Sequence, residues 1–180
     1  MDIALFFHLL GVVLLFVALG ITQFGGARLR RTAKLDEAKV WITMLEHAGR
    51  LFGPAFVLIL GAGIYMASDT WGFERPFINV GLISVVVMIA AGGGYVGRTF
   101  TKLGKSLDAG EVRAAELPAL INRRGLWAVN FSLDTLAVGV IWVMVAKPDW
   151  AQAVAVAVGT LALGAVVGGM IGGRSPAPAK

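Results

Sequence analysis

The sequence predicts an all-α integral membrane bundle of five transmembrane helices, with the N-terminus outside and the C-terminus in the cytoplasm. Of the 180 residues, 57% are hydrophobic and only 15% are charged, and the mean hydropathy is +0.78. A soluble domain of this length could not bury so much apolar surface. Five apolar stretches are long enough, or nearly so, to cross a hydrocarbon core of ~30 Å at ~1.5 Å per residue. The basic residues gather in two of the loops, and this asymmetry sets the orientation.

The five predicted spans belong to one bundle domain, residues 1–173. They cover residues 3–22, 51–68, 77–97, 126–146 and 151–172. The first, within MDIALFFHLLGVVLLFVALG, has no basic residue ahead of its apolar run. Because a secretory signal peptide needs a basic front end, we expect this span to be retained. The tail at 174–180, RSPAPAK, is predicted to be flexible.

Two cytoplasmic loops are predicted, at residues 23–50 and 98–125. Each contains six Lys or Arg residues, whereas the loops on the other side contain only Arg75 and Lys147. The positive-inside rule therefore places both basic loops and the C-terminus in the cytoplasm. The net charge of +5 is then explained by anionic lipid headgroups, and no nucleic acid partner is expected. The chain has no cysteine, which excludes disulfides, thiolate zinc sites and a cysteine nucleophile.

Both basic loops are predicted to be partly helical. Apolar residues recur at helical spacing over residues 36–50, which predicts an amphipathic helix that leads into the second span. Pro54 is the expected kink, because proline removes a backbone donor. The second loop is expected to break near Gly110 and Pro118. Trp127, at the start of the fourth span, is predicted to be an anchor at the membrane surface.

Small residues line one face of the fifth span. The stretch GTLALGAVVGGMIGG places four of them four residues apart: Thr160, Gly164, Gly168 and Gly172. Gly93 and Gly97 stand in the same relation in the third span. A stripe without bulky side chains lets a neighbouring backbone approach closely, which is how helices associate in lipid. That neighbour is either another helix of the same bundle or a second subunit.

Asp134 is the one acid deep in a predicted span, about nine residues, or ~14 Å, from the inner end of the fourth. An ionised carboxylate there costs ~2.5–3.5 kcal/mol, so we expect the group to be protonated, solvated or partnered. Asn130, one turn away, and Thr160 in the fifth span are the candidate hydrogen-bond partners. Two interpretations stay open: a proton-relay acid, or a neutral structural residue held by hydrogen bonds.

His8 is the candidate cofactor ligand. It lies in the first span, which enters from outside, whereas His47 precedes the second span on the cytoplasmic side. A depth difference of ~20 Å disfavours a heme held by both histidines. Met66 and Met144 fall near the outer ends of their spans, in the same layer as His8. Imidazole and thioether groups suit copper, and His with Met is an axial pair for heme. The alternative is a histidine that only forms hydrogen bonds.

Several segments resemble a bacterial family of integral membrane proteins of unknown function, itself distantly similar to copper-resistance D-type proteins and HemJ-type protoporphyrinogen oxidases. They are FHLLGVVLLFVALG, GRLFGPAFVLILGAGIYM and MVAKP, and the resemblance covers roughly residues 5–148. It implies a multi-pass location in the bacterial cytoplasmic (inner) membrane. It also implies a heme-linked histidine at His8, or copper held by His8, Met66 and Met144. The oxidases further rely on a basic residue in a later span, which none of the five spans here contains.

Three functional hypotheses result. The first is a non-catalytic bundle or an accessory subunit of a larger membrane complex, which would contact lipids and other subunits, or a second copy through the fifth span. The second is handling of heme b or copper at His8 near the outer surface. The third is proton-coupled transport through Asp134. Transporters often contain an internal repeat, and this sequence has none that would support the third hypothesis.

Overall fold

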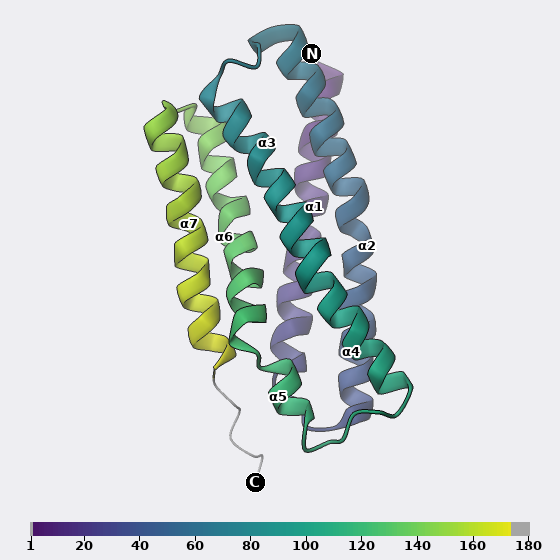
Figure 1. Ribbon diagram of the computed structural model, residues 1–180. Helices are drawn as coiled ribbons and strands as arrows, with labels where there is room; N and C mark the ends of the chain where they lie inside the picture. Colours follow the sequence, from purple (N-terminus) through teal and green to yellow (C-terminus); the bar gives the residue numbers. More distant parts are fainter. Residues whose placement is uncertain (1, 174–180) are drawn as a thin grey trace.

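The protein is a bundle of helices in the part that the computed structural model describes, residues 2–173 (Figure 1). Its elements are α1 (Asp2–Leu29), α2 (Leu35–Met66), η1 (Ala67–Trp71), α3 (Pro76–Met88), η2 (Ile89–Gly97), α4 (Arg98–Asp108), α5 (Leu117–Ile121), α6 (Arg124–Ala146) and α7 (Trp150–Gly172). The segments η1 and η2 are π-helical. No strand occurs in the described range, so the predicted all-α class is confirmed for these residues. The predicted flexible tail at 174–180 lies outside them.

Five helical segments of this range are long and apolar enough to cross a membrane: Asp2–Leu29, Leu35–Trp71, Pro76–Asp108, Leu117–Ala146 and Trp150–Gly172. Large apolar side chains are exposed along all of them. Val145, for example, is 78% exposed and Val57 is 70% exposed. Water disfavours such a surface, whereas a hydrocarbon solvent does not.

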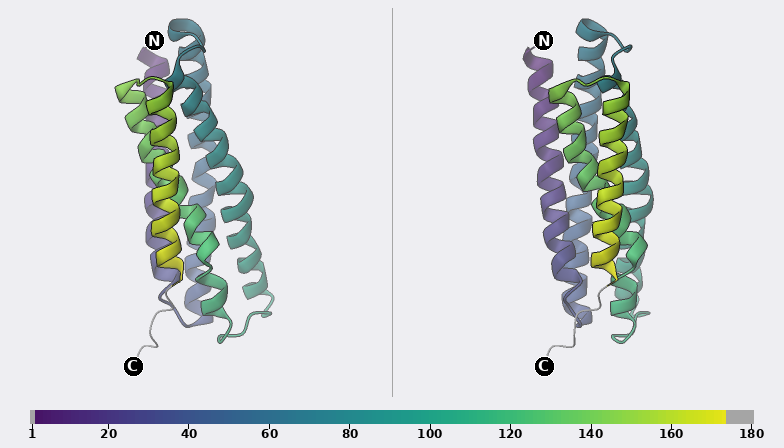
Figure 2. Two further views of the ribbon diagram at one scale, coloured as in Figure 1. Left: turned by 60° about the vertical axis from the view of Figure 1, so that its left-hand side comes forward. Right: turned by 90° about the vertical axis from the view of Figure 1, so that its left-hand side faces the viewer.

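The helices form two antiparallel hairpins and a rod that links them. α1 packs along α2, and α6 packs along α7. α3, η2 and α4 form the rod, which begins against α6 and α7 and ends against α2 (Figures 1 and 2). The N-terminus and the α6–α7 turn lie at one end of the bundle, here called the N-terminal end (Figure 2). The α1–α2 turn, α5 and the last turn of α7 lie at the opposite, C-terminal end.

The α6–α7 turn shows how local sequence sets the helix ends. Lys147 ends α6 in the left-handed region at φ 49°. Asp149 then caps α7, because its side chain accepts a hydrogen bond from the backbone N–H of Gln152. The Lys147 ammonium lies 4.2 Å from the ring centroid of Trp71, a cation–π contact that joins this turn to η1.

Several helical segments extend beyond the predicted spans at the C-terminal end, one of them Pro76–Asp108, which continues 11 residues past the predicted end at residue 97. α1 continues to Leu29, seven residues past the predicted end at residue 22. α2 starts at Leu35, so the predicted amphipathic helix and the second span are a single helix that continues through Pro54. The predicted loops are correspondingly shorter.

The helix breaks that were predicted near Gly110 and Pro118 both occur, because residues 109–116 between α4 and α5 are not helical. Gly110 has a φ of +70° and follows the end of α4, as expected of a residue that tolerates the left-handed region. Pro118 stands in the first turn of α5, where its missing N–H is not needed. The non-helical residues 109–116 lie directly before α5, so the helix is broken near Pro118 as predicted.

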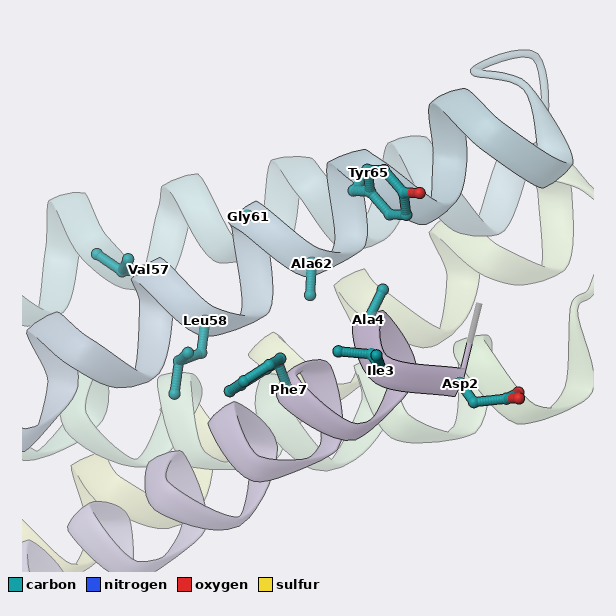
Figure 3. Close-up of a pocket in the computed structure, with 9 residues that line it drawn as sticks. All are labelled: Asp2, Ile3, Ala4, Phe7, Val57, Leu58, Gly61, Ala62 and Tyr65. Atoms are coloured by element: carbon teal, nitrogen blue, oxygen red, sulfur yellow. The ribbon is translucent and has the colours of Figure 1, made fainter.

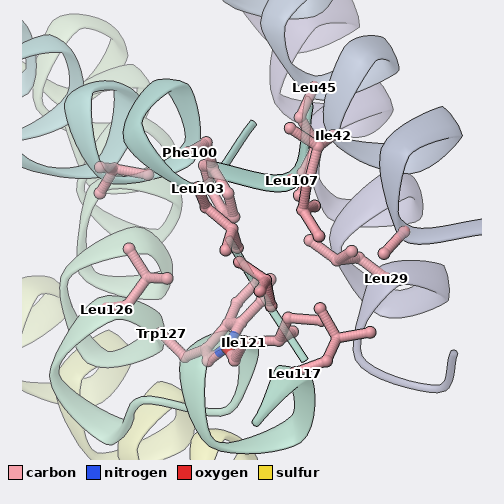
Figure 4. Close-up of a cluster of buried hydrophobic side chains, with 13 residues drawn as sticks. Leu29, Ile42, Leu45, Phe100, Leu103, Leu107, Leu117, Ile121, Leu126 and Trp127 are labelled. Atoms are coloured by element: carbon pink, nitrogen blue, oxygen red, sulfur yellow. The ribbon is translucent and has the colours of Figure 1, made fainter. Parts of the chain in front are cut away.

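A core of buried apolar side chains joins α1, α2, α4, α5 and α6 at the C-terminal end (Figure 4). Leu29, Leu117 and Trp127 are each no more than 1% exposed. The Trp127 indole N–H donates a hydrogen bond to the backbone oxygen of Ile121 at 2.7 Å. The predicted anchor role of Trp127 is therefore wrong, because the indole is packed inside the protein with its polar group satisfied.

Candidate functional site

A cavity of about 300 Å³ lies between α1, α2, α3–η2 and α6. Most of its lining is apolar, and includes Leu15 from α1, Phe52 and Phe56 from α2, and Leu133 from α6. The Phe52 and Phe56 rings are stacked, with centroids 6.2 Å apart. A concave, mostly apolar space with a few polar groups is the usual form of a small-molecule site.

Glycines, most of them exposed, line the rim of this space. Gly92, Gly93 and Gly97 of η2 line the cavity, as do Gly49 and Gly53 of α2. A Cβ atom added at Gly93, Gly49 or Gly53 would have no neighbouring atom within 4 Å. The π-helical winding of η2 widens the helix at this position, a feature that often accompanies functional sites.

The expected packing role of Gly93 and Gly97 is not seen, because both glycines border the cavity. For Gly97 the one atom near an added Cβ is the Gly92 oxygen of the same segment, at 3.3 Å. Neither glycine therefore provides a close approach to another helix of the described chain.

Asp134 is the one ionisable side chain of the cavity lining. The side-chain amide of Gln23, on α1, donates a hydrogen bond to Asp134 Oδ2. Within residues 2–173, Asp134 forms no ion pair, since the two that occur join Lys34 to Glu37 and Lys39 to Asp108. The expectation of a hydrogen-bonded acid thus agrees with the structure, but the partner is a residue that the sequence reasoning did not select.

The two predicted partners of Asp134 lie in different places. Asn130 lines the cavity on the same helix, one turn from Asp134. Thr160 is instead part of the α6–α7 seam, where its hydroxyl donates to the Val156 oxygen at 2.8 Å. A Cβ on Gly139 would lie 2.7 Å from the Thr160 hydroxyl oxygen. Thr160 is therefore a packing residue of this seam.

Gln23 was missed because the predicted first span ended at residue 22. A signal was present, however. Leu15, Leu19 and Gln23 follow one another at intervals of four residues, which places them on one face of a continuous helix. Leu15 and Leu19 line the same cavity.

The glycine stripe of α7 faces α6 in the same chain. A Cβ on Gly164 would collide with the backbone oxygen of Phe131, and one on Gly168 with that of Trp127. At Gly172 a Cβ would lie 3.0 Å from the Trp127 side chain. Of the two neighbours considered for this stripe, the structure shows the one within the bundle.

His8 faces α2 near the N-terminal end. Its Nδ1 lies 3.0 Å from the backbone oxygen of Ile59, and because a carbonyl can only accept, Nδ1 is the donor. Gly63 lies beside the ring, since a Cβ there would be in van der Waals contact with the imidazole at 3.4 Å. In the neutral ring this tautomer leaves Nε2 with a lone pair.

The predicted His8, Met66 and Met144 ligand set is not supported at Met144. The terminal methyl of Met144 lies against Gly81 of α3, whereas His8 bonds to α2. Within the described residues no group of three or more His, Asp or Glu side chains could hold a metal ion. His8 is also outside the shallow hollow between α1 and α2 at this end (Figure 3), which is lined by Ile3, Phe7 and Leu58 among others and by one charged residue, Asp2.

Comparisons with protein-family models, with curated proteins and with solved structures find no match to this chain. Its function is therefore inferred from the geometry alone.

Proposed function

We propose that this chain is a multi-pass integral membrane protein, with its N-terminus outside, that binds one small, largely apolar molecule in the cavity and catalyses no reaction. The observation that carries the proposal is the cavity itself, with Asp134 and Asn130 on one side and phenylalanine and leucine side chains around them.

Physical reasoning supports a ligand in this space. Apolar side chains around a space of about 300 Å³ lose dispersion energy wherever no other group packs against them. Asp134 also has a single hydrogen bond among the described residues, and a polar group inside a membrane is costly unless it is partnered. A ligand with an apolar body and one polar group would remove both costs.

The accessory-subunit hypothesis stays a prediction. The glycine stripe that would have favoured an intersubunit contact is covered by α6 of the same chain. A partner subunit would therefore have to bind elsewhere on the bundle. Proton-coupled transport through Asp134 also stays a prediction, and it shares the cavity with the function proposed here.

The test compares two adjacent glycines of η2. Gly93 lines the cavity and Gly94 does not, and a Cβ at either position meets no atom within 4 Å. Gly93→Leu adds a side chain at the rim of the cavity, where it should obstruct a bound molecule, whereas Gly94→Leu adds the same side chain at a position that does not line the cavity. Each protein is purified in mild detergent, and its bound small molecules are extracted and measured by mass spectrometry.

We expect the wild type and Gly94→Leu to carry the same compound at similar stoichiometry, and Gly93→Leu to lose it. A wild-type protein from its native membrane without any enriched compound would overturn the proposal. So would a compound that Gly93→Leu retains in full.

A further inference from the structure

A groove separate from the cavity runs along the last two turns of α7 at the C-terminal end. It is lined by Val166, Gly169, Met170 and Gly173 of the α7 region and by Arg124 of α6. Val166 is 59% exposed and Met170 is 64% exposed. A Cβ at Gly169 would meet no atom within 4 Å, so the floor of the groove is open between these two apolar side chains.

One arginine, Arg124, lines this groove, and a second, Arg30, contacts the same turn of α7. The Arg124 guanidinium lies beside Gly173, where a Cβ would collide with it. Arg30, from the end of α1, reaches the same turn of α7, and its Nη1 donates to the Ile171 oxygen at 3.4 Å. The Arg30 guanidinium also stacks over the Trp127 ring, 4.8 Å from the centroid. Two permanently positive groups therefore flank the last turn of α7.

These charges have no carboxylate partner in the described chain. The ion pairs of residues 2–173 join Lys34 to Glu37 and Lys39 to Asp108, and neither involves Arg30 or Arg124. Arg30 Nε is buried and has no hydrogen-bond partner among the described residues. Burial lowers the pKa of Arg30, and the positive charge of Arg31 adds to this effect. An anion at the Arg124 end of the groove would add a favourable negative charge near this last turn of α7.

We infer that the groove binds an anionic phospholipid. Its phosphate lies at the Arg124 guanidinium, and an acyl chain follows Val166, Gly169 and Met170 along α7. Guanidinium groups bind phosphate oxygens through paired hydrogen bonds, and basic pockets between membrane helices bind anionic lipid headgroups. The apolar floor points to a lipid in preference to free phosphate. From Val166 to Gly173 it extends ~10 Å along the helix, which matches the upper part of an acyl chain.

The test uses two pairs of neighbouring or equivalent residues. Arg123 and Arg124 are adjacent and both exposed, but only Arg124 lines the groove. Gly159 and Gly169 are both on α7 with open space at the Cβ position, but only Gly169 lines the groove. Arg124→Gln and Gly169→Leu are the test variants, and Arg123→Gln and Gly159→Leu are their controls.

Binding of phosphatidylglycerol and of phosphatidylcholine is measured by native mass spectrometry of the purified protein in a neutral detergent. We expect the wild type to prefer phosphatidylglycerol, and Arg124→Gln to weaken its binding about tenfold, as for the loss of hydrogen bonds to a charged group. Arg123→Gln should leave it unchanged. Gly169→Leu should weaken the binding of both lipids, whereas Gly159→Leu should not.

Several results would overturn the inference. Equal binding of the two lipids would exclude recognition of the headgroup charge. Equal losses in Arg123→Gln and Arg124→Gln would indicate a diffuse surface charge without a site. Full displacement of the lipid by millimolar inorganic phosphate would indicate a free-phosphate site. If Arg124→Gln does not fold, the comparison of lipid binding by Gly169→Leu and Gly159→Leu still tests the inference, because it depends on the groove and not on the arginine.

Discussion

The close packing of α6 against α7 predicts that adjacent glycines of α7 respond oppositely to the same substitution. In Gly168→Ala the new Cβ would collide with the Trp127 oxygen, 2.6 Å from the carbonyl carbon and 2.9 Å from the Ala128 Cα. These are backbone atoms, so no side-chain rotation relieves the overlap and the two helices must separate. Overpacking of this kind costs about 1–3 kcal/mol. In Gly169→Ala the Cβ meets no atom within 4 Å, and the replacement of a helical glycine stabilises by up to about 1 kcal/mol.

The helix-propensity gain is common to both variants, so their difference isolates the packing cost. We therefore expect Gly168→Ala to unfold about 1–3 kcal/mol more easily than Gly169→Ala. The assay is equilibrium unfolding of each protein in mixed micelles as the fraction of dodecyl sulfate rises, followed by circular dichroism. Equal midpoints for the two variants would refute the arrangement of α6 and α7 described above.

Four further predictions concern the cavity, the histidine and the orientation. Gln23→Leu should lower the free energy of unfolding by about 1–3 kcal/mol, because it leaves Asp134 without its hydrogen-bond donor. In a double-mutant cycle, adding Asp134→Leu should recover most of that loss of stability. Additive losses of stability would show that the two side chains do not interact. Reconstituted wild-type protein and Asp134→Asn should pass protons at the same rate in a vesicle pH assay, and a wild-type flux that the variant lacks would favour the relay interpretation. If His8 binds heme, the purified wild-type protein should show a Soret band that His8→Ala lacks. A spectrum without a Soret band, together with no copper by elemental analysis, would contradict both the heme and the copper prediction. Because the chain has no cysteine, an impermeant maleimide should label Glu74→Cys in intact cells and Glu111→Cys only after permeabilisation; the reverse pattern would invert the proposed orientation.

The five long apolar helices could be predicted from hydropathy, because each contains a window with few charges. The helix ends at the C-terminal end could not. Residues such as Leu29 and Leu117 are buried against other helices of the chain, so their helices are stabilised by protein contacts among charged neighbours. A hydropathy window averages those charges in and ends the span early. The same averaging placed Trp127 at a surface, although it is 1% exposed.

The site was predicted in part. An acid deep in an apolar helix is conspicuous in a sequence, and Asp134 was selected on that ground. Its donor, Gln23, is 111 residues away along the chain, and a single sequence contains no information on which helices face each other. His8 could likewise be selected from its residue type. Its hydrogen bond to the Ile59 carbonyl could not be predicted, because every residue has a backbone carbonyl and the sequence does not show which one is nearby.

The glycines of α7 and η2 show most clearly what the sequence cannot predict, namely what a helix face contacts. The spacing of four residues in α7 and in η2 predicted one role for both, a surface that another helix approaches. In α7 that role is filled, since an added Cβ at Gly164 or Gly168 would strike the backbone of α6. In η2 the same spacing borders the cavity, and an added Cβ at Gly93 would meet no atom within 4 Å. Periodicity specifies which residues share a helix face, but what that face meets depends on the neighbouring helix. The same residue type therefore closes one interface and lines the rim of a cavity elsewhere, and substitution at Gly168 should cost stability whereas substitution at Gly93 should cost binding.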